Sequence, residues 1–183
     1  MDNTAYLRYL DGDDSAFEEI VTQYRDGLLL YICTFVGDMN FSEEICEEVF
    51  VKLAIKKPHF SDDGHFKTWL YTISRNEALS HLRKIKRRRE LPLEEAESSI
   101  NERLDLEANY IKSEQKKELY KALSEIGENY REVLRLCYLE GFKNKEAAKI
   151  MHKTPRQIEN LLYRAKAALK EKLLKEGFVY ENL

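Results

Sequence analysis

The sequence predicts an all-α protein made of two small helical domains joined by a flexible acidic linker. Its 183 residues include only seven Gly and three Pro, and few chain-breaking residues favour long helices. Apolar residues recur at steps of three and four along most of the chain, which is the period of a helix with one buried face. The chain length suits one larger domain or two small ones.

The first two helices are expected to begin at capping signals. Ser15 and Glu18 have the spacing of a capping box, and the helix they open reaches about Phe35, with Gly37 as the expected stop. Ser42 is expected to cap a second helix, SEEICEEVFVKLA. One broad face of this second helix carries Ile45, Val49, Phe50 and Leu53, and the other face carries Glu43, Glu44, Glu47 and Glu48.

A long helix follows the loop KKPHFSDDGH and runs from Phe66 to Glu90, FKTWLYTISRNEALSHLRKIKRRRE. It opens with aromatic residues around Trp69, the only Trp of the chain, and ends with six basic residues among the seven from Arg83 to Arg89. Its apolar stripe, which is expected to be mostly core, consists of Trp69, Leu70, Ile73, Leu79 and Leu82. Its polar side consists of Lys67, Arg75, Asn76, His81, Arg83, Lys84 and the basic run up to Arg89.

The helical pattern weakens from Leu91, where Pro92 and paired serines accompany six acidic residues against one basic residue up to Glu107. We therefore expect a first domain at 1–90, an acidic linker at 91–109 and a second domain at 110–183. Within the second domain, helices are expected from 110 to 126, from a cap at Asn129 and Glu132 to Gly141, from 144 to 151, and from 154 to about 176.

The last two of these helices form a predicted helix-turn-helix. Thr154-Pro155-Arg156-Gln157 supplies an N-cap Thr, a Pro at the first helical position and a Gln at the third. Small Ala148 lies where the helices would cross, and the seam would be filled by Met151, Ile158 and Leu161. The exposed side offers residues that pair with base edges in the major groove, namely Arg156, Gln157, Asn160, Tyr163 and Arg164.

The net charge of −3 conceals a strong segregation of charge. From Lys143 to Lys175 there are ten basic residues against three acidic ones, so the overall charge does not argue against nucleic-acid binding. Three widely spaced cysteines are expected to be free buried thiols in a reducing cytoplasm. With no secretory signal and no apolar run long enough to span a membrane, the sequence predicts a cytoplasmic protein without membrane insertion.

Three segments together carry a resemblance to a known family. SEEICEEVFVKL, FKTWLYTISRNEALSHLRK and the helix-turn-helix that ends in LLYRAKAALKEKL follow one another in the order, spacing and length of a bacterial RNA polymerase sigma factor. The chain most closely resembles the small extracytoplasmic-function group of the sigma-70 family, which keeps only the second and fourth sigma domains. WLYTISRN is similar to the family stretch W-L-Y-x-I-A-x-N.

The resemblance implies that the first domain captures the melted −10 promoter element and holds a flipped base. By motif position, the pocket resembles the loop Phe60 to Phe66 backed by Asn76. Such a pocket must supply new contacts to the face and edge of the flipped base. The basic run would hold the nearby backbone. The implied −10 residues are Phe60, Asp62, Asp63, His65, Phe66, Lys67, Trp69, Arg75, Asn76, Arg83, Lys84, Arg87 and Arg88.

The resemblance assigns the −35 element to Thr154, Arg156, Gln157, Asn160, Tyr163 and Arg164. Three residues depart from the family pattern. Glu159 and Leu161 stand where many members carry Lys or Arg, and His152 replaces the usual turn Gly. These changes could remove up to two phosphate contacts or alter the −35 sequence that is read, and His in a left-handed turn has a modest cost.

The resemblance also implies protein partners. Core RNA polymerase would dock on Glu44, Glu47, Glu48 and Phe50 through the coiled coil of its largest subunit. The acidic linker would thread toward the RNA exit path, and an anti-sigma factor is an expected inhibitor. No catalytic residue, cofactor or metal is expected.

Two alternatives remain at this point. A helix-turn-helix regulator that is not a sigma factor would have no need of the aromatic and basic segment around Trp69. An all-α pyrophosphohydrolase would use paired acids such as Glu43-Glu44 and Glu47-Glu48 to hold Mg²⁺, but it needs a second acidic pair on the following helix. The next such spacing, Glu102 to Asp105, lies in the predicted linker.

Overall fold

The computed structural model describes residues 4–60, 65–89, 119, 122–123 and 125–175. Every regular element within these residues is helical, which confirms the predicted fold class. The chain divides into two compact units, with the main boundary after Glu95. The predicted linker at 91–109 and most of the helix predicted at 110–126 lie outside the described residues.

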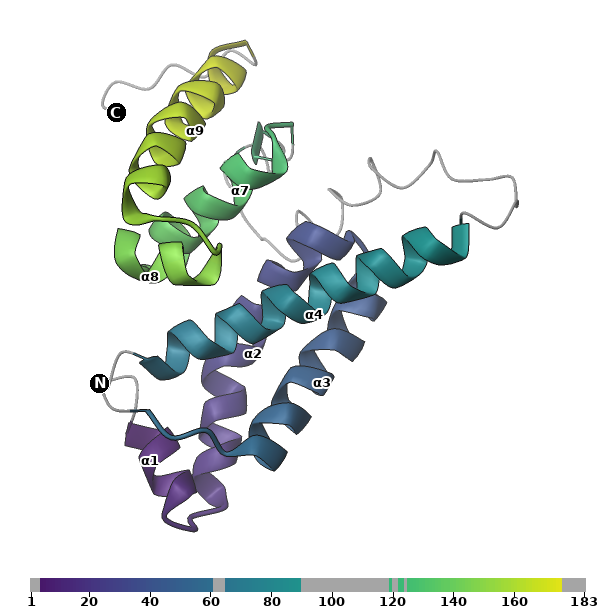
Figure 1. Cartoon of the computed structure of the whole chain (residues 1–183), viewed down its shortest axis with the longest axis vertical. Helices are drawn as coiled ribbons and strands as arrows, with labels where there is room; N and C mark the ends of the chain where they lie inside the picture. The colour runs from purple at the N-terminus through teal and green to yellow at the C-terminus, as the bar shows by residue number, and fades with distance from the viewer. Residues whose placement is uncertain (1–3, 61–64, 90–118, 120–121, 124, 176–183) are drawn as a thin grey trace. The chain divides into compact units, whose positions relative to one another are not determined.

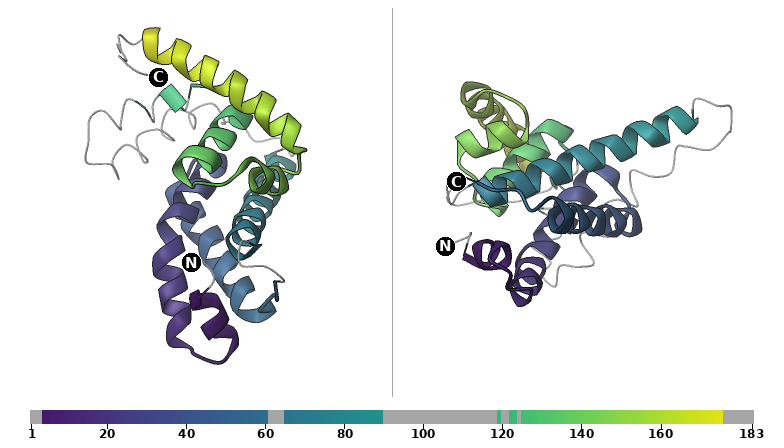
Figure 2. Two further views of the ribbon diagram at one scale, coloured as in Figure 1. Left: turned by 90° about the vertical axis from the view of Figure 1, so that its left-hand side faces the viewer. Right: turned by 60° about the horizontal axis from the view of Figure 1, so that its bottom comes forward.

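The N-terminal unit contains α1 (Thr4–Leu10), α2 (Ser15–Val36), α3 (Met39–Lys56) and α4 (His65–Arg89). Helices α2, α3 and α4 pack on one another, and α1 packs against α2 (Figures 1 and 2). The sequence pattern predicts no helix before Ser15, so α1 is a helix that only the structure reveals. The largest side chains of the core include Tyr6, Ile20, Leu28, Tyr31, Ile32, Leu53, Phe66, Leu70 and Tyr71.

The helix ends confirm one predicted signal and correct two others. Gly37 ends α2 in a left-handed conformation with φ of 71°, and its N–H donates to the carbonyl of Cys33 at 2.9 Å, as expected for a C-terminal Gly. The Ser15 hydroxyl, however, donates to Asp13 and does not cap the helix. Ser42 does not cap α3 either, because Asp38 is the N-cap and accepts from the Phe41 N–H at 3.0 Å. The buried Ser42 hydroxyl instead donates to the Asp38 carbonyl at 2.6 Å.

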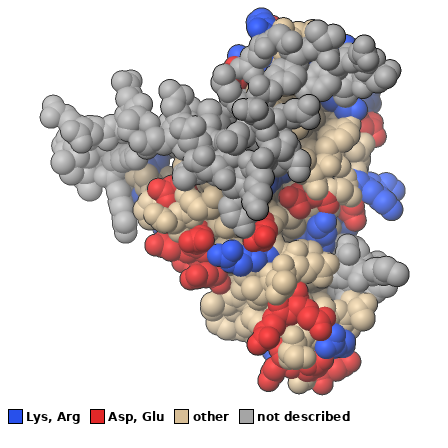
Figure 3. Space-filling view, turned by 180° about the vertical axis from the view of Figure 1, so that it is seen from behind, with Lys and Arg blue, Asp and Glu red and all other residues tan. Residues whose placement is uncertain are grey.

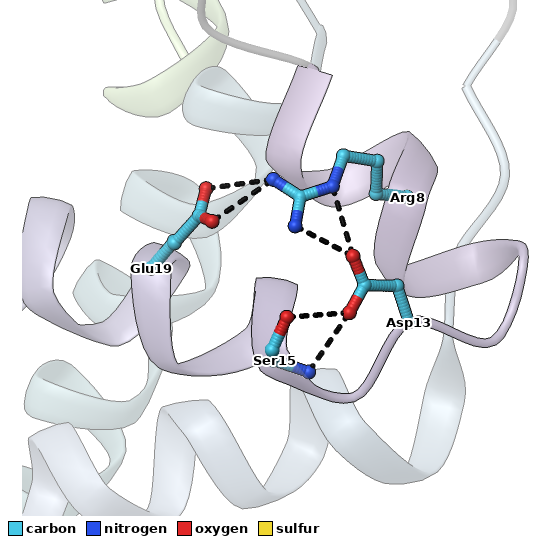
Figure 4. Close-up of polar contacts among 4 residues, drawn as sticks. All are labelled: Arg8, Asp13, Ser15 and Glu19. Atoms are coloured by element: carbon cyan, nitrogen blue, oxygen red, sulfur yellow. Dashed lines mark hydrogen bonds and ion pairs between the residues drawn. The ribbon is translucent and has the colours of Figure 1, made fainter.

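An ionic network fastens α1 to α2 (Figure 4). Arg8 of α1 donates through Nε to Asp13 at 2.9 Å and through Nη1 to both carboxylate oxygens of Glu19 at 2.9 and 3.0 Å. Asp13 also accepts from the backbone N–H and the hydroxyl of Ser15 at 3.1 and 2.6 Å. The bonds from Ser15 and from Arg8 hold the pKa of Asp13 below its ordinary value. These contacts hold α1 against α2, but they are exposed or only part-buried and therefore add little to stability.

The buried face of α4 is displaced from the predicted stripe. Phe66, Leu70, Ser74 and Ala78 have no exposed surface and follow one another at steps of four. Among the predicted stripe only Leu70 is buried, while Trp69, Ile73, Leu79 and Leu82 are half-buried. The Ser74 hydroxyl can lie in the core because it donates to the Leu70 carbonyl at 2.8 Å.

The C-terminal unit contains α7 (Glu128–Leu134), which continues into a π-helical turn (Arg135–Leu139), then α8 (Asn144–Ile150) and α9 (Pro155–Lys175). Helices α7 and α9 pack together. Gly127 is the N-cap of α7, so the cap predicted at Asn129 is wrong by two residues. Arg131 ties α7 to the preceding segment by donating to the carbonyls of Leu123 and Ile126 at 3.2 and 3.3 Å.

Candidate functional site

An aromatic group forms where α3 leads into α4. The Phe60 ring lies 6.1 Å from the Trp69 ring and 6.2 Å from the Phe66 ring, measured between centroids. Phe60 and Trp69 are half-buried, so each keeps part of its ring available to a ligand. Phe66 has no exposed surface. Phe66 therefore belongs to the core in this structure, and its predicted contact with DNA stays a prediction that its burial does not support.

The polar side of α4 continues from this aromatic group. Asn76 is exposed, and Arg83 and Arg87 follow it at seven and eleven positions, which places all three on one side of the helix. The cationic residues with exposed side chains here are Arg83, Lys84, Lys86 and Arg87. Arg75 and Lys67 are half-buried, and the Lys67 ammonium lies 5.9 Å from the centre of the Tyr71 ring. The aromatic group thus adjoins a basic helix side.

Four of the predicted residues fall outside what the structure describes. Asp62 and Asp63 lie in the segment 61–64, and the side chains of His65 and Arg88 are likewise not described. Among the remaining −10 candidates, Trp69, Asn76, Arg83 and Arg87 follow one another at steps of seven and four along one side of α4, whereas Phe66 lies on the buried side. Aromatic faces stack on unpaired bases, and cationic side chains neutralise phosphates.

The start of α9 has the predicted capping box. The Thr154 hydroxyl accepts from the Gln157 N–H at 3.2 Å, and Gln157 Oε1 accepts from the Thr154 N–H at 2.8 Å. Two backbone donors of the helix start are satisfied reciprocally. The bond from the Thr154 N–H holds Gln157 Oε1 at the helix start, and both amide N–H groups of Gln157 can donate to a base.

The exposed side of α9 carries the other predicted −35 residues. Arg156, Asn160, Tyr163 and Arg164 are all exposed, and Tyr163 keeps 79% of its surface accessible. A hollow of about 250 Å³ on this side is lined by Lys153, Gln157, Asn160, Leu161 and Arg164. Ile158 and Ala165 lie on the opposite side of α9 and are fully buried. The two sides of α9 are thus an apolar seam and a polar face rich in donors.

The structure describes all three residues that the sequence analysis singled out as departures from the family pattern, namely His152, Glu159 and Leu161. His152 has φ of 53°, which confirms a left-handed residue at the turn where a Gly is usual. Glu159 is exposed, and Leu161 is half-buried at the hollow. Leu161 thus contributes an apolar wall to the hollow on the polar face of α9.

We expect loss of the Thr154 cap to destabilise the C-terminal unit. Thr154→Ala leaves the Gln157 N–H without its acceptor, and such losses cost about 1 kcal/mol. Thermal unfolding followed by circular dichroism should therefore shift to lower temperature, whereas Thr154→Ser should behave like the wild type. Equal stability of the Ala and Ser variants would contradict the capping role.

The acidic face of α3 borders a groove. Glu44, Glu47 and Glu48 are exposed, and clusters of acidic side chains are visible on the rear face shown in Figure 3. The groove, of about 410 Å³, lies between α2 and α3 and is lined by Val21, Arg25, Leu29, Glu43, Cys46, Glu47, Phe50 and Val51. Arg25 bridges the two helices through Glu43 at 3.1 Å. Phe50, predicted as a contact residue, is 7% exposed and serves as groove lining.

Two exposed apolar residues extend this face and are missed by the sequence analysis. Val51 and Ile55 keep 55% and 77% of their surface accessible. They follow Glu44 and Glu48 at helical spacing, and that periodicity was the signal that could have identified them. An acidic face that continues into apolar side chains suits a basic and partly apolar protein partner.

The thiols and acids of the described residues show no sign of a reactive or metal-binding centre. Burial raises the pKa of the Cys46 thiol to about 11, so the thiol is not an activated nucleophile. No cluster of three or more potential metal ligands occurs among the residues that the structure describes. None of the described helices is long and apolar enough to span a membrane.

Comparison with known proteins connects both units to one family. The family model "Sigma-70 region 2" matches residues 20–89, and the model "Sigma-70, region 4" matches residues 116–169. These two matches together account for more than half of the chain.

Two curated relatives match most of the chain. The ECF RNA polymerase sigma factor SigM of Bacillus subtilis is 28% identical over 153 residues, which cover 84% of this chain and 92% of SigM. The RNA polymerase sigma-H factor of Pseudomonas aeruginosa is 26% identical over 170 residues, which cover 88% of each protein.

Two solved structures share the fold. CnrH, solved in complex with the cytosolic domain of CnrY, has a TM-score of 0.67 at 20% identity, covering 97% of this chain and 99% of CnrH. RpoE of Bartonella quintana, solved with the anti-sigma factor NepR, has a TM-score of 0.66 at 22% identity, covering 86% and 96%.

Proposed function

Since the chain belongs to the sigma-70 family of RNA polymerase sigma factors, in its extracytoplasmic-function group, and serves in transcription initiation, we propose that it directs core polymerase to promoters with paired −35 and −10 elements. The first domain, 1–90, captures melted −10 DNA, and the second, 110–183, reads −35 duplex. The acidic linker, 91–109, connects them.

The observation that carries this proposal is the junction of aromatic and basic residues at the start and along one side of α4. Phe60 and Trp69 are half-buried and lie 6.1 Å apart between ring centroids, and Asn76 and the exposed cations Arg83 and Arg87 follow Trp69 on the same side of α4. A regulator that binds only duplex DNA needs cations but no platform for an unstacked base. The junction therefore supports a sigma factor over a helix-turn-helix regulator of another kind.

In the proposed −10 complex, the half-buried Phe60 ring stacks on a base taken out of the duplex. Asn76 carries both a hydrogen-bond donor and an acceptor and pairs with the edge of that base. Arg83 and Arg87 hold the phosphates that follow. Stacking is worth about 1–3 kcal/mol per base, which offsets the loss of stacking in the duplex.

In the proposed −35 complex, the exposed side of α9 enters the major groove. Arg156, Asn160 and Arg164 contact base edges, and the Gln157 amide donates to an acceptor such as a guanine O6 or N7. Tyr163 and Thr154 border this surface. Leu161 provides an apolar contact of the kind that a thymine methyl makes.

Core polymerase is the proposed partner of the acidic face of α3, and an anti-sigma factor is the proposed inhibitor. The face combines Glu44, Glu47 and Glu48 with the exposed Val51 and Ile55. The structural relatives CnrH and RpoE were solved with CnrY and with the anti-sigma factor NepR. By analogy with those complexes, we infer that a dedicated protein restrains this chain as well.

Charge reversal on α3 is expected to weaken binding to core polymerase. Glu44→Lys with Glu47→Lys places like charges against a basic partner and should lower the affinity about tenfold at low ionic strength, with a smaller effect at high salt. Competition with a labelled sigma factor for core polymerase measures this change.

The matched control is Asp11→Lys with Glu18→Lys, which makes the same change in net charge at exposed positions that do not belong to α3. Both variants should retain the helical content of the wild type. If the control weakens core binding as much as the α3 variant, net charge rather than this face governs docking.

The function as a whole is tested by transcription from genomic DNA. Purified protein is added to sigma-free bacterial core polymerase on fragmented DNA of the source genome, and the 5′ ends of the transcripts are sequenced. We expect a few discrete start sites that share two upstream elements about two helical turns apart. No new start sites from a folded preparation that binds core polymerase would overturn the proposal.

A further inference from the structure

One side chain of the first helix touches both ends of the connection between α3 and α4. The Tyr6 hydroxyl donates to the Pro58 carbonyl at 2.5 Å, and the Tyr6 ring lies 5.7 Å from the Phe60 ring. The same ring stacks on Phe66, in the first turn of α4, at 4.2 Å with an interplanar angle of 16°. Tyr6 therefore holds described residues on either side of the segment 61–64.

Tyr6 is itself held firmly, although α1 has only seven residues. A helix this short has no stability of its own in water and depends on tertiary contacts. The Arg8 network joins α1 to α2 (Figure 4), and the Tyr9 ring packs on Phe17 of α2 at 5.0 Å. Tyr6 is 1% exposed. Contacts with α2 thus hold Tyr6 in place, and Tyr6 in turn contacts Pro58 and Phe60 in the connection between α3 and α4.

The hydroxyl bond constrains the chain where it leaves α3. Lys57 is the C-cap of α3 and takes a left-handed conformation with φ of 39°, which turns the chain toward Pro58. Burial raises the pKa of Tyr6 well above its ordinary value, so the hydroxyl remains protonated and remains a donor. Without this donor, the Pro58 carbonyl loses its partner in a part-buried environment, two residues before Phe60.

We propose that Tyr6 is a positioning residue for base capture: its hydroxyl and ring fix Pro58 and Phe60 so that the Phe60 ring is presented to an unstacked base. This inference rests on the proposed −10 role of the first domain. A ring that is already ordered loses less conformational freedom when it binds a base, and this preorganisation strengthens binding without any contact between Tyr6 and DNA.

The test uses the full-length protein and the substitution Tyr6→Phe, which keeps the ring and removes the hydroxyl. The matched control is Tyr9→Phe, which removes a hydroxyl from a buried tyrosine one turn away on the same helix. Holoenzyme is assembled with each protein, and open complexes are measured by permanganate reactivity of unpaired thymines at a start site that the wild type uses. Competition for core polymerase is measured in parallel.

We expect Tyr6→Phe to lower open-complex formation about three- to tenfold, which is the range for loss of one hydrogen bond. Core binding should equal that of the wild type, and Tyr9→Phe should match the wild type in both assays. Trp69 is the only tryptophan and lies beside Phe60. Its quenching by acrylamide should therefore increase in Tyr6→Phe alone.

Two results would overturn the inference while leaving the proposed function intact. One is wild-type opening by Tyr6→Phe. The other is an equal loss of core binding and opening, which would show general destabilisation of the unit. If the wild-type protein binds core polymerase but opens no promoter, the proposed function is wrong and the inference falls with it.

Discussion

Phe60→Ala combined with Asn76→Ala is expected to reduce open-complex formation about 10- to 100-fold while leaving the affinity for core polymerase unchanged. The Ala side chains remove the ring that stacks on the unstacked base and the amide that reads its edge, and stacking alone is worth about 1–3 kcal/mol. Neither residue belongs to the fully buried core, because Phe60 is half-buried and Asn76 is exposed. The loss should therefore concern DNA and spare the fold.

Permanganate reactivity of unpaired thymines at one mapped promoter measures the effect, and competition for core polymerase is measured on the same preparations. His59→Ala is the matched control, since His59 is exposed and directly precedes Phe60. That control should open the promoter as the wild type does. If the double variant instead loses core binding, the base-capture site has been placed on the wrong surface.

The elements predicted most accurately from the sequence are those with strong local signals. The stop at Gly37 and the capping box of Thr154 and Gln157 are confirmed because a left-handed C-terminal Gly and a reciprocal side-chain cap act within a few residues. The left-handed His152 follows the same logic, since the turn between α8 and α9 imposes this conformation on whichever residue occupies it.

Tertiary contacts explain what the sequence could not predict. Helix α1 has only seven residues, so its existence depends on tertiary contacts such as those of Tyr6 with Pro58 and of Tyr9 with Phe17. The buried stripe of α4 was misplaced because Ser74 and Ala78 do not look like core residues in a sequence. The Ser74 hydroxyl donates to the Leu70 carbonyl of the same helix, so its burial costs little free energy. Apolar neighbours such as Ile73 are half-buried instead.

The burial of the predicted site residues shows the same contrast between local signals and tertiary contacts. The exposed residues of α9 follow from helical periodicity once the start at Thr154 is known. Phe66 was assigned to DNA by its position in the motif of the family that the chain resembles, yet its ring stacks on Tyr6 in the core. Val51 and Ile55 were overlooked because apolar residues on a helix are expected to be buried, whereas these two remain exposed. Asp62 and Asp63 lie outside the described residues and remain predictions.

The placement of Phe66 in the core leads to the largest expected effect on stability. Its ring has no exposed surface and contacts Tyr6 at 4.2 Å and Tyr24 at 5.5 Å between centroids. Phe66→Ala removes these contacts and leaves a cavity, so we expect the free energy of unfolding of the N-terminal unit to fall by about 3–5 kcal/mol. Because Trp69 lies on α4 of this unit, its fluorescence during urea unfolding isolates the transition from that of the C-terminal unit.

Phe41→Ala is the matched control, because Phe41 keeps 42% of its surface accessible and its truncation should cost less than about 1 kcal/mol. The comparison separates the two roles that Phe66 has been given. If Phe66 is a core residue, its truncation lowers the free energy of unfolding, and promoter opening declines only as the folded fraction of the protein declines. If Phe66→Ala is as stable as Phe41→Ala but fails to open promoters, the ring contacts DNA after all, and the connection between α3 and α4 must rearrange when the base is captured.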